Sequence, residues 1–336
     1  MTSGAQKGVI FSGMRPTGKL HLGNYLGALQ NWVALQQEYR CIYCAVDIHA
    51  LTTFEGVADV AEIKPNINDM VLDWLAAGID PEQSQVFVQS HVPEVMTLHT
   101  LLSMVTPLGW LLRVPTFKEK VRQMDETEES VNYGLVGYPV LQTADIILYK
   151  ADTVPVGRDQ VPHLELAREI VRRFNNHYGE TFPEPQAILA EDPLVLGLDG
   201  QNKMSKSLDN HLELAASPEE TAKRVATAFT DPQRLRRDDP GRPEVCNVYS
   251  LHKIFSPPGE MATVYDECTS ATRGCVDCKR HLAANINSHL EPFRERRREY
   301  EARPSFVKEV LEDGAKKARV IAQQTIEEVY EKMGLA

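Results

Sequence analysis

The stretch VIFSGMRPTGKLHLGNYLGALQNWVAL, residues 9–35, contains the pattern that decides the fold. It begins with a short apolar run at residues 9–11, which is typical of a buried strand, and continues into a turn rich in glycine. From residue 23 the apolar side chains recur three or four residues apart, which predicts an amphipathic helix over residues 23–39. A strand that leads through a turn into a helix is the first unit of a parallel α/β sheet.

The alternation of strand and helix continues through the first 200 residues. Further strands are predicted at residues 41–47, 85–89 and 152–156, and helices at residues 58–78, 138–149 and 162–175. Strands that alternate with helices predict parallel pairing. From residue 217 onward the pattern indicates helices only. We therefore expect an α/β fold: a Rossmann-like parallel sheet domain with a C-terminal all-helical domain.

The composition excludes several classes of protein. The 336 residues carry a net charge of −11, with 43% hydrophobic and 25% charged residues, which is ordinary for a globular protein with a sizeable core. An acidic chain is not a typical nucleic-acid binder, because phosphate contacts come from clustered lysine and arginine, although a local basic patch remains possible. No apolar run approaches the roughly 20 residues of a membrane span, and the N-terminal apolar run is too short for a secretory signal. We expect a cytoplasmic protein with no membrane contact.

The turn after the first strand has the properties of an anion site. Gly13, Gly18 and Gly23 allow a backbone to approach a ligand closely, and the following helix begins with free N–H groups that favour a phosphate. The turn matches neither the P-loop nor the G-x-G-x-x-G dinucleotide motif. A tight turn with incidental glycines is the structural alternative.

A second polar stretch, QNKMSKSLDN at residues 201–210, carries two lysines three residues apart. It has no apolar periodicity, so it is predicted to be a loop. A solvated surface loop is one interpretation, and a clamp on a polyphosphate is the other. The loop by itself does not decide between them.

Two motifs taken together indicate a family. Residues 21–24, HLGN, resemble the HIGH signature of class I aminoacyl-tRNA synthetases, and residues 203–207 are its KMSKS signature letter for letter. This resemblance implies that the two segments close on ATP from opposite sides, with Mg²⁺ on the phosphates. The catalytic residues that it implies are His21, Asn24, Lys120, Lys203 and Lys206.

Longer stretches resemble the tryptophanyl-tRNA synthetases in particular: residues 11–29, 46–52, 116–120, 137–149 and 154–169. The implied activity is the ATP-dependent activation of L-tryptophan and its transfer to tRNA(Trp). The implied ATP-binding residues are Ser12, Gly13, Arg15, Gly23, Asn24, Gly157, Asp159, Lys203, Met204, Ser205 and Lys206, with Lys118 as a further basic position. The implied tryptophan-binding residues are Phe11, Val46, His49, Tyr138, Leu141, Gln142, Asp145 and Gln160.

The resemblance gives Asp145 the role of accepting the indole N–H. An indole offers one hydrogen-bond donor and no acceptor, which suits a carboxylate in an apolar pocket. Tyr138, Leu141, Gln142 and Asp145 recur at helical spacing and share one face. Many bacterial relatives have methionine at the position of Gln142, and Gln-x-x-Asp also resembles some tyrosyl-tRNA synthetases. A tyrosyl enzyme and a non-catalytic RNA-binding or regulatory paralogue are therefore the alternatives.

The cysteines form two groups. Cys41 and Cys44 are three residues apart in a predicted strand, so they are expected to point to opposite faces as small buried side chains. The four cysteines of the C-terminal region suit zinc or an iron–sulfur cluster, both of which accept four thiolates. The resemblance to a few tryptophanyl-tRNA synthetases favours a four-iron–four-sulfur cluster, with zinc or unliganded thiols as the alternatives. These candidate metal ligands are Cys246, Cys268, Cys275 and Cys278.

The expected domain organisation follows from these motifs. Residues 1–200 are predicted to form the Rossmann-like catalytic domain, with an inserted helical segment at about residues 91–136 that could mediate dimerisation. Residues 201–336 are predicted to form the KMSKS loop and a helical anticodon-binding domain. Two arginine-rich stretches, at residues 234–237 and 294–298, are candidate tRNA contacts, and related enzymes imply a homodimer.

Overall fold

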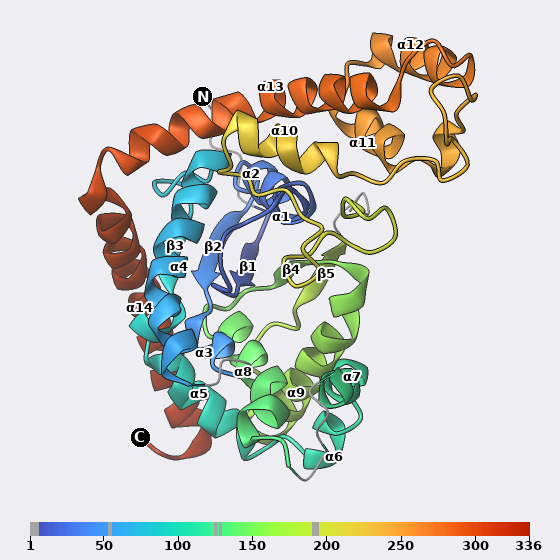
Figure 1. Ribbon diagram of the computed structural model, residues 1–336. Coiled ribbons are helices and arrows are strands. Elements are labelled where there is room, and N and C mark those ends of the chain that lie inside the picture. Colours follow the sequence, from blue (N-terminus) through green and yellow to red (C-terminus); the bar gives the residue numbers. More distant parts are fainter. Residues whose placement is uncertain (1–6, 53–55, 124–126, 128–129, 190–194) are drawn as a thin grey trace.

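The structure, a computed structural model, describes residues 7–52, 56–123, 127, 130–189 and 195–336. At its centre is a five-stranded sheet of order β3-β2-β1-β4-β5 in which every pairing is parallel (Figure 1). The strands are β1 (Val9–Met14), β2 (Arg40–Ala45), β3 (Gln85–Val88), β4 (Thr153–Val156) and β5 (Gln186–Leu189). The parallel α/β prediction is confirmed. Strand β5 was not predicted; its apolar run is only three residues long, Ala187 to Leu189, and the strand is mostly exposed.

The helices follow the strands in the expected alternation and then continue alone to the C-terminus. They are α1 (Leu22–Asn24), α2 (Gln30–Leu35), α3 (Asp47–Ala50), α4 (Val57–Ala77), α5 (Glu94–Ser103), α6 (Leu108–Leu111), α7 (Pro115–Gln123), α8 (Tyr133–Ile147), α9 (Val161–Tyr178), α10 (Pro218–Ala226), α11 (Asn247–Phe255), α12 (Pro258–Thr269), α13 (Cys275–Glu301) and α14 (Pro304–Met333). Between α1 and α2 the helix widens into a π-turn at Tyr25–Leu29. The predicted first helix is therefore present, but with a local insertion of the kind found at functional sites.

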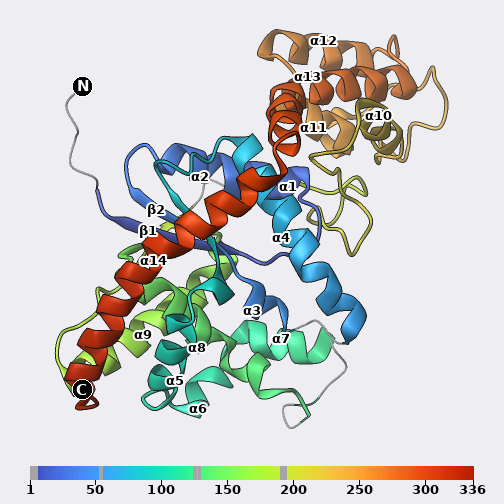
Figure 2. The same cartoon turned by 90° about the vertical axis from the view of Figure 1, so that its left-hand side faces the viewer.

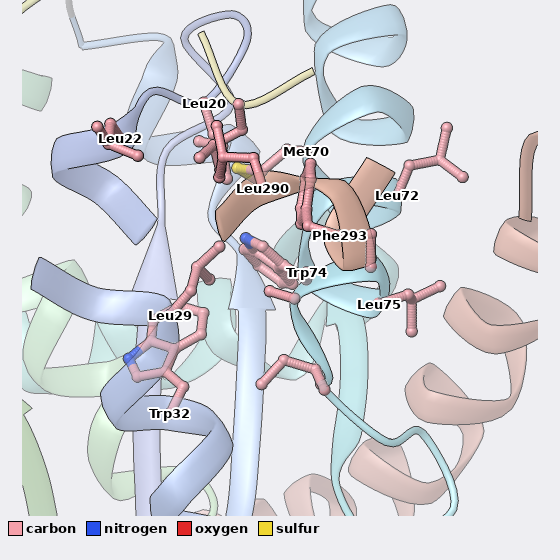
Figure 3. Packing of buried hydrophobic residues seen from close by; sticks show 14 of the residues in the cluster. Leu20, Leu22, Leu29, Trp32, Met70, Leu72, Trp74, Leu75, Leu290 and Phe293 are labelled. Atoms are coloured by element: carbon pink, nitrogen blue, oxygen red, sulfur yellow. The ribbon is translucent and has the colours of Figure 1, made fainter. Parts of the chain in front are cut away.

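Two hydrophobic clusters lie on opposite faces of the sheet, because successive strand residues point to opposite sides. One cluster joins the face that carries Tyr43 to α1, α2, α4 and α13. Its centre contains Trp32 and Trp74, whose rings meet edge to face at 5.3 Å, and Leu290 and Phe293 from α13 pack against the same region (Figure 3). The other cluster joins the face that carries Phe11 to α5, α8, α9 and α14.

The alternation of strand side chains also separates the first two cysteines. Cys41 belongs to the cluster on one face of the sheet and Cys44 to the cluster on the other, and both are at most 1% exposed. The prediction that they are buried on opposite faces is confirmed.

The helical region after residue 217 leaves the sheet and then returns to it. Helices α11 and α12 lie away from the sheet, α13 runs back from them to contact α4, and α14 continues along β3 and α5 (Figures 1 and 2). Gly314 of α14 lies so close to β3 that an added Cβ would be 2.0 Å from the carbonyl oxygen of Val86. The last helix thus completes the core of the α/β part, and it covers an edge strand that would otherwise be open.

The arginines at residues 294–298 are only partly available to solvent. Arg294 and Arg297 are 5% and 7% exposed. Arg294 donates hydrogen bonds to Asn287 and Thr221, and Arg297 pairs with Asp69 and Asp73 of α4. The prediction that these two arginines contribute to a basic surface is wrong, because they hold α13 to α10 and α4 instead.

A search of the described residues for membrane-spanning segments found no helix with the length and apolar character that a bilayer crossing requires.

Candidate active site

A cavity of about 590 Å³ opens at the carboxyl ends of β1, β2 and β4. This is where open parallel sheets bind ligands. Residues from five separate parts of the chain meet there. The predicted site residues among its lining are Phe11, Ser12, Gly13, Arg15, His21, Gly23, Asn24, Val46, His49, Tyr138, Gln142, Asp145, Gly157, Asp159, Gln160, Lys203 and Met204.

One end of the cavity is formed by the helix that begins after His21. The Asn24 side chain accepts a hydrogen bond from the backbone N–H of His21 at 3.1 Å, which fixes the first turn of the helix. Burial, assisted by Lys206, His211 and Lys203, lowers the pKa of His21 to about 4, so its imidazole is neutral at neutral pH. Its Nδ1 atom is buried beside Gly23 and has no hydrogen-bond partner among the described residues.

The KMSKS segment lies against this same end. Lys203 and Met204 line the cavity, and Lys206 reaches across to donate a hydrogen bond to the backbone oxygen of Thr17 at 2.9 Å. Burial lowers the pKa of Lys206. Gly18 has a φ of +110°, a backbone conformation that favours glycine, and it lies beside the Lys206 ammonium.

Asn210 holds the KMSKS segment in shape. Its side-chain oxygen accepts from the backbone N–H of Ser205 at 2.7 Å, and its amide nitrogen donates to Asp199 at 2.9 Å. Asp199 also accepts hydrogen bonds from Gln201 and Asn202, and together these interactions lower its pKa to about 2. These hydrogen bonds make the segment a braced turn.

Backbone pairing brings the two motifs together. The N–H of Leu22 donates to the oxygen of Leu212 at 2.8 Å, and the N–H of Leu214 donates to the oxygen of Leu20 at 3.0 Å. The chain after the KMSKS segment is thus fastened on either side of His21. Two stretches about 180 residues apart in sequence become the two walls of one end of the cavity.

The other end of the cavity is built around the buried carboxylate of Asp145, which is 2% exposed. His49 Nε2 lies 2.9 Å from its Oδ2. Gln89 donates to both of its oxygens at 2.8 and 2.9 Å. Nearby, the Tyr138 hydroxyl lies 3.1 Å from the His163 ring. An apolar cavity with one fixed carboxylate suits a flat aromatic side chain that carries a hydrogen-bond donor.

Several predicted residues lie elsewhere. Leu141 packs in the hydrophobic cluster that contains Phe11 and is not in the cavity lining. Ser205 contacts Ser207 through their hydroxyls at 2.8 Å. Lys118 is exposed on α7, and the side chain of Lys120 lies outside the part of the chain that the structure describes.

The sequence did not single out Gln89 or His163. Gln89 directly follows strand β3, and a polar residue at the carboxyl end of a parallel strand was the signal that could have identified it. His163 lies two residues into α9 and has no comparable signal in the sequence.

The four later cysteines lie together in the helical region, and each is partly buried. Burial outweighs the charge of Arg273 and raises the pKa of Cys278 to about 12, and the thiols of Cys246, Cys268 and Cys275 act in the same direction. Within the described residues, however, no group of three or more His, Cys, Asp or Glu side chains is arranged to hold a metal ion. The iron–sulfur prediction is not confirmed.

Comparisons with known proteins agree on one group. The family described as "tRNA synthetases class I (W and Y)" matches residues 4–291. The tryptophan–tRNA ligase of Thermotoga maritima is 48% identical over 97% of this chain and 99% of its own, and that of Deinococcus radiodurans is 45% identical over 97% and 98%. The structure of tryptophanyl-tRNA synthetase from Campylobacter jejuni, complexed with ADP and tryptophan, matches with a TM-score of 0.88 at 35% identity, over 97% of this chain and all of that one.

Proposed function

The chain belongs to the class I tRNA synthetases of the tryptophan and tyrosine family, among the tryptophan–tRNA ligases, and we propose that it activates L-tryptophan with ATP and transfers it to tRNA(Trp). One observation supports this most directly. A single cavity has the HLGN and KMSKS segments at one end and the buried carboxylate of Asp145 at the other. A nucleotide and an aromatic amino acid can therefore lie end to end.

The first step joins the amino-acid carboxylate to ATP. A carboxylate oxygen attacks the α-phosphorus, the bond to the β-phosphate breaks, and pyrophosphate leaves with the electron pair. The carboxylate is already a nucleophile, so the step needs no general base. The contribution of the protein is to position the reactants and to neutralise charge on the phosphates.

The residues around the phosphate end suit that role. Lys203 and Lys206 supply positive charge from a braced turn, and the neutral His21 and the amide of Asn24 offer hydrogen bonds without competing charge. Mg²⁺ on the phosphates would supply further neutralisation. In the second step a ribose hydroxyl of tRNA attacks the activated carbonyl carbon, and AMP leaves.

The specificity for tryptophan is assigned to Asp145. Its carboxylate is buried and accepts hydrogen bonds, so a bound ring without a donor would leave it underpaired. Asp145→Ala should lower kcat/KM for tryptophan by about 10- to 100-fold, the range expected for losing a hydrogen bond to a buried charge. Asp313→Ala, which removes an exposed carboxylate on α14, is the matched control.

The test is amino-acid-dependent ATP–pyrophosphate exchange with each of the twenty amino acids. Exchange that depends on tryptophan alone, followed by charging of tRNA(Trp), is the expected result. Exchange that depends on tyrosine would overturn the substrate assignment. No exchange with any amino acid from a folded protein that binds ATP would indicate a non-catalytic paralogue.

We further propose the domain roles of the sequence analysis. Residues 1–200, with the inserted segment 91–136, form the catalytic domain, and residues 201–336 bind the anticodon end of tRNA. The exposed apolar side chains Met96, Met104 and Leu108 suit a dimer interface on the inserted segment. Light scattering at several protein concentrations tests the homodimer, and a cytoplasmic location is part of the same proposal.

The cysteine group is proposed to bind a four-iron–four-sulfur cluster, with zinc as the alternative. The donor set supports this, because the four thiols lie at the ends of the neighbouring helices α11, α12 and α13. The cluster would fasten these helices together and requires no redox role. Anaerobically purified protein should be brown and contain iron, and Cys268→Ser should lose both properties. A colourless protein with one equivalent of zinc would establish the alternative.

A further inference from the structure

We propose that Gln89 is a positioning residue that fixes the Asp145 carboxylate as a pure hydrogen-bond acceptor and so selects aromatic amino acids with a ring N–H. The inference rests on the proposed function and adds a residue to it. Gln89 is 1% exposed and is absent from the cavity lining. It therefore acts on a ligand only through Asp145.

The orientation of the Gln89 amide is determined by its surroundings. Its Oε1 accepts from the backbone N–H of Ile48 at 3.1 Å and lies 3.4 Å from that of His49. These two donors require the oxygen on that side, so the nitrogen must face Asp145. A flipped amide would place its N–H groups against backbone N–H groups and its oxygen against a carboxylate.

The fixed amide of Gln89 determines how many acceptor sites the Asp145 carboxylate can offer to a ligand. Nε2 of Gln89 donates to both oxygens of Asp145, and His49 contacts Oδ2. A carboxylate has about four acceptor sites, and these three contacts leave room for about one more. Because Nε2 can only donate, the two Asp145 oxygens that it contacts both serve as acceptors.

The remaining acceptor site on Asp145 determines the class of substrate that the cavity favours. An indole N–H supplies the missing donor and brings no acceptor. A ring that carries sulfur in place of the N–H has nearly the same shape but leaves the carboxylate short of a donor. A site built to hydrogen-bond a group rejects analogues that lack it much more strongly than it rejects a change of shape.

The experiment compares L-tryptophan with 3-(benzothiophen-3-yl)-L-alanine, its analogue without the ring N–H, in ATP–pyrophosphate exchange. The quantity measured is the ratio of their kcat/KM values. Gln89→Met removes both hydrogen-bonding ends at similar length and should lower the ratio about tenfold, with KM for ATP unchanged. Gln83→Met is the matched control, because Gln83 also donates to an aspartate, Asp80, but on an exposed turn. Its ratio should equal that of the wild type.

Gln89→Glu keeps the hydrogen-bond acceptor of the side chain and removes its donor, so it tests the two ends of the amide separately. One oxygen can still accept from Ile48, whereas the other now faces Asp145 without a proton. The ratio should be low at pH 8 and should rise as the pH falls, when the carboxylate pair shares a proton and a donor returns. The titratable groups that face Asp145 are His49 on α3, His99 on α5, Cys44 on β2 and Tyr149 after α8. All four are also present in Gln89→Met, whose ratio should not recover with pH.

The outcomes distinguish the two levels of the proposal. If the wild type shows no tryptophan-dependent exchange, the proposed function fails. If the wild type is active and a folded Gln89→Met keeps the wild-type ratio, the role of Gln89 alone is overturned. Should Gln89→Met not fold, Gln89→Glu decides, because a ratio that is independent of pH contradicts the donor assignment.

Discussion

The close approach of α14 to β3 predicts that adding a single methyl group at Gly314 will lower stability. Gly314 lies against the β3 backbone, and a Cβ there would be 2.0 Å from the carbonyl oxygen of Val86, 2.7 Å from its carbonyl carbon and 3.0 Å from its nitrogen. Carbon and oxygen atoms normally approach no closer than about 3.3 Å. Gly314→Ala therefore requires the helix and the strand to separate by about 1 Å.

The magnitude is the difference between two opposing effects. Replacing glycine by alanine within a helix contributes about 0.5–1 kcal/mol of stability. Overpacking a closed contact costs about 1–3 kcal/mol, and the upper part of that range applies because the opposing atoms are backbone. We expect Gly314→Ala to lower the free energy of unfolding by about 1–2 kcal/mol.

Urea denaturation measures this difference, and α12 provides the control. Gly259 is also helical, and an added Cβ there meets nothing within 4 Å. Gly259→Ala should be neutral or slightly stabilising. The reasoning is refuted if Gly314→Ala unfolds at the same urea concentration as Gly259→Ala, or at a higher one.

Three other variants probe the contact between α13 and α4, the KMSKS turn and His21. Arg297→Met should lower stability by about 3–5 kcal/mol, because it leaves the 1%-exposed Asp73 side chain without its partner, whereas Arg319→Met at an exposed pair should cost at most about 1 kcal/mol in the same urea titration. Asn210→Ala should raise KM for ATP about tenfold in pyrophosphate exchange and leave KM for tryptophan unchanged, because it loosens only the KMSKS turn. The depressed pKa of His21 means that the unfolded chain binds the extra proton first, so stability should fall as pH drops from about 6.5 to 4. His21→Gln should flatten that decline by about 1–3 kcal/mol, as thermal unfolding at each pH would show.

The parts of the fold that the sequence predicted are those with a local signal. Strands β1 and β2 are apolar runs followed by glycine or polar residues, and both are buried on two faces. Strand β5 has a shorter apolar run, Ala187 to Leu189, and is mostly exposed. The sequence also gave no sign that α14 returns to the sheet, because a helix pattern predicts an apolar face but not the surface that the face meets. Gly314 reads as a weak helix residue until Val86 is known to lie beside it.

The site divides in the same way. Tyr138, Gln142 and Asp145 share a helical face by spacing and line the cavity together. Leu141 shares that spacing but lies at the edge of the face, where it packs into the core. Periodicity determines direction to within a wide arc, so it does not distinguish a residue that borders a cavity from one just behind it.

Two features that the sequence did not reveal, the packing of α14 and the positioning of Asp145, both involve strand β3. Val86 near its start opposes Gly314, and Gln89 directly after its end holds Asp145. A side chain that positions a carboxylate must itself be held within about half an ångström, which an unsupported edge strand does not provide. Helix α14 supplies that support by closing over β3. The close packing of the last helix and the selection of a ring N–H are therefore linked through one short strand, and a larger residue at position 314 should weaken the preference for tryptophan as well as the fold.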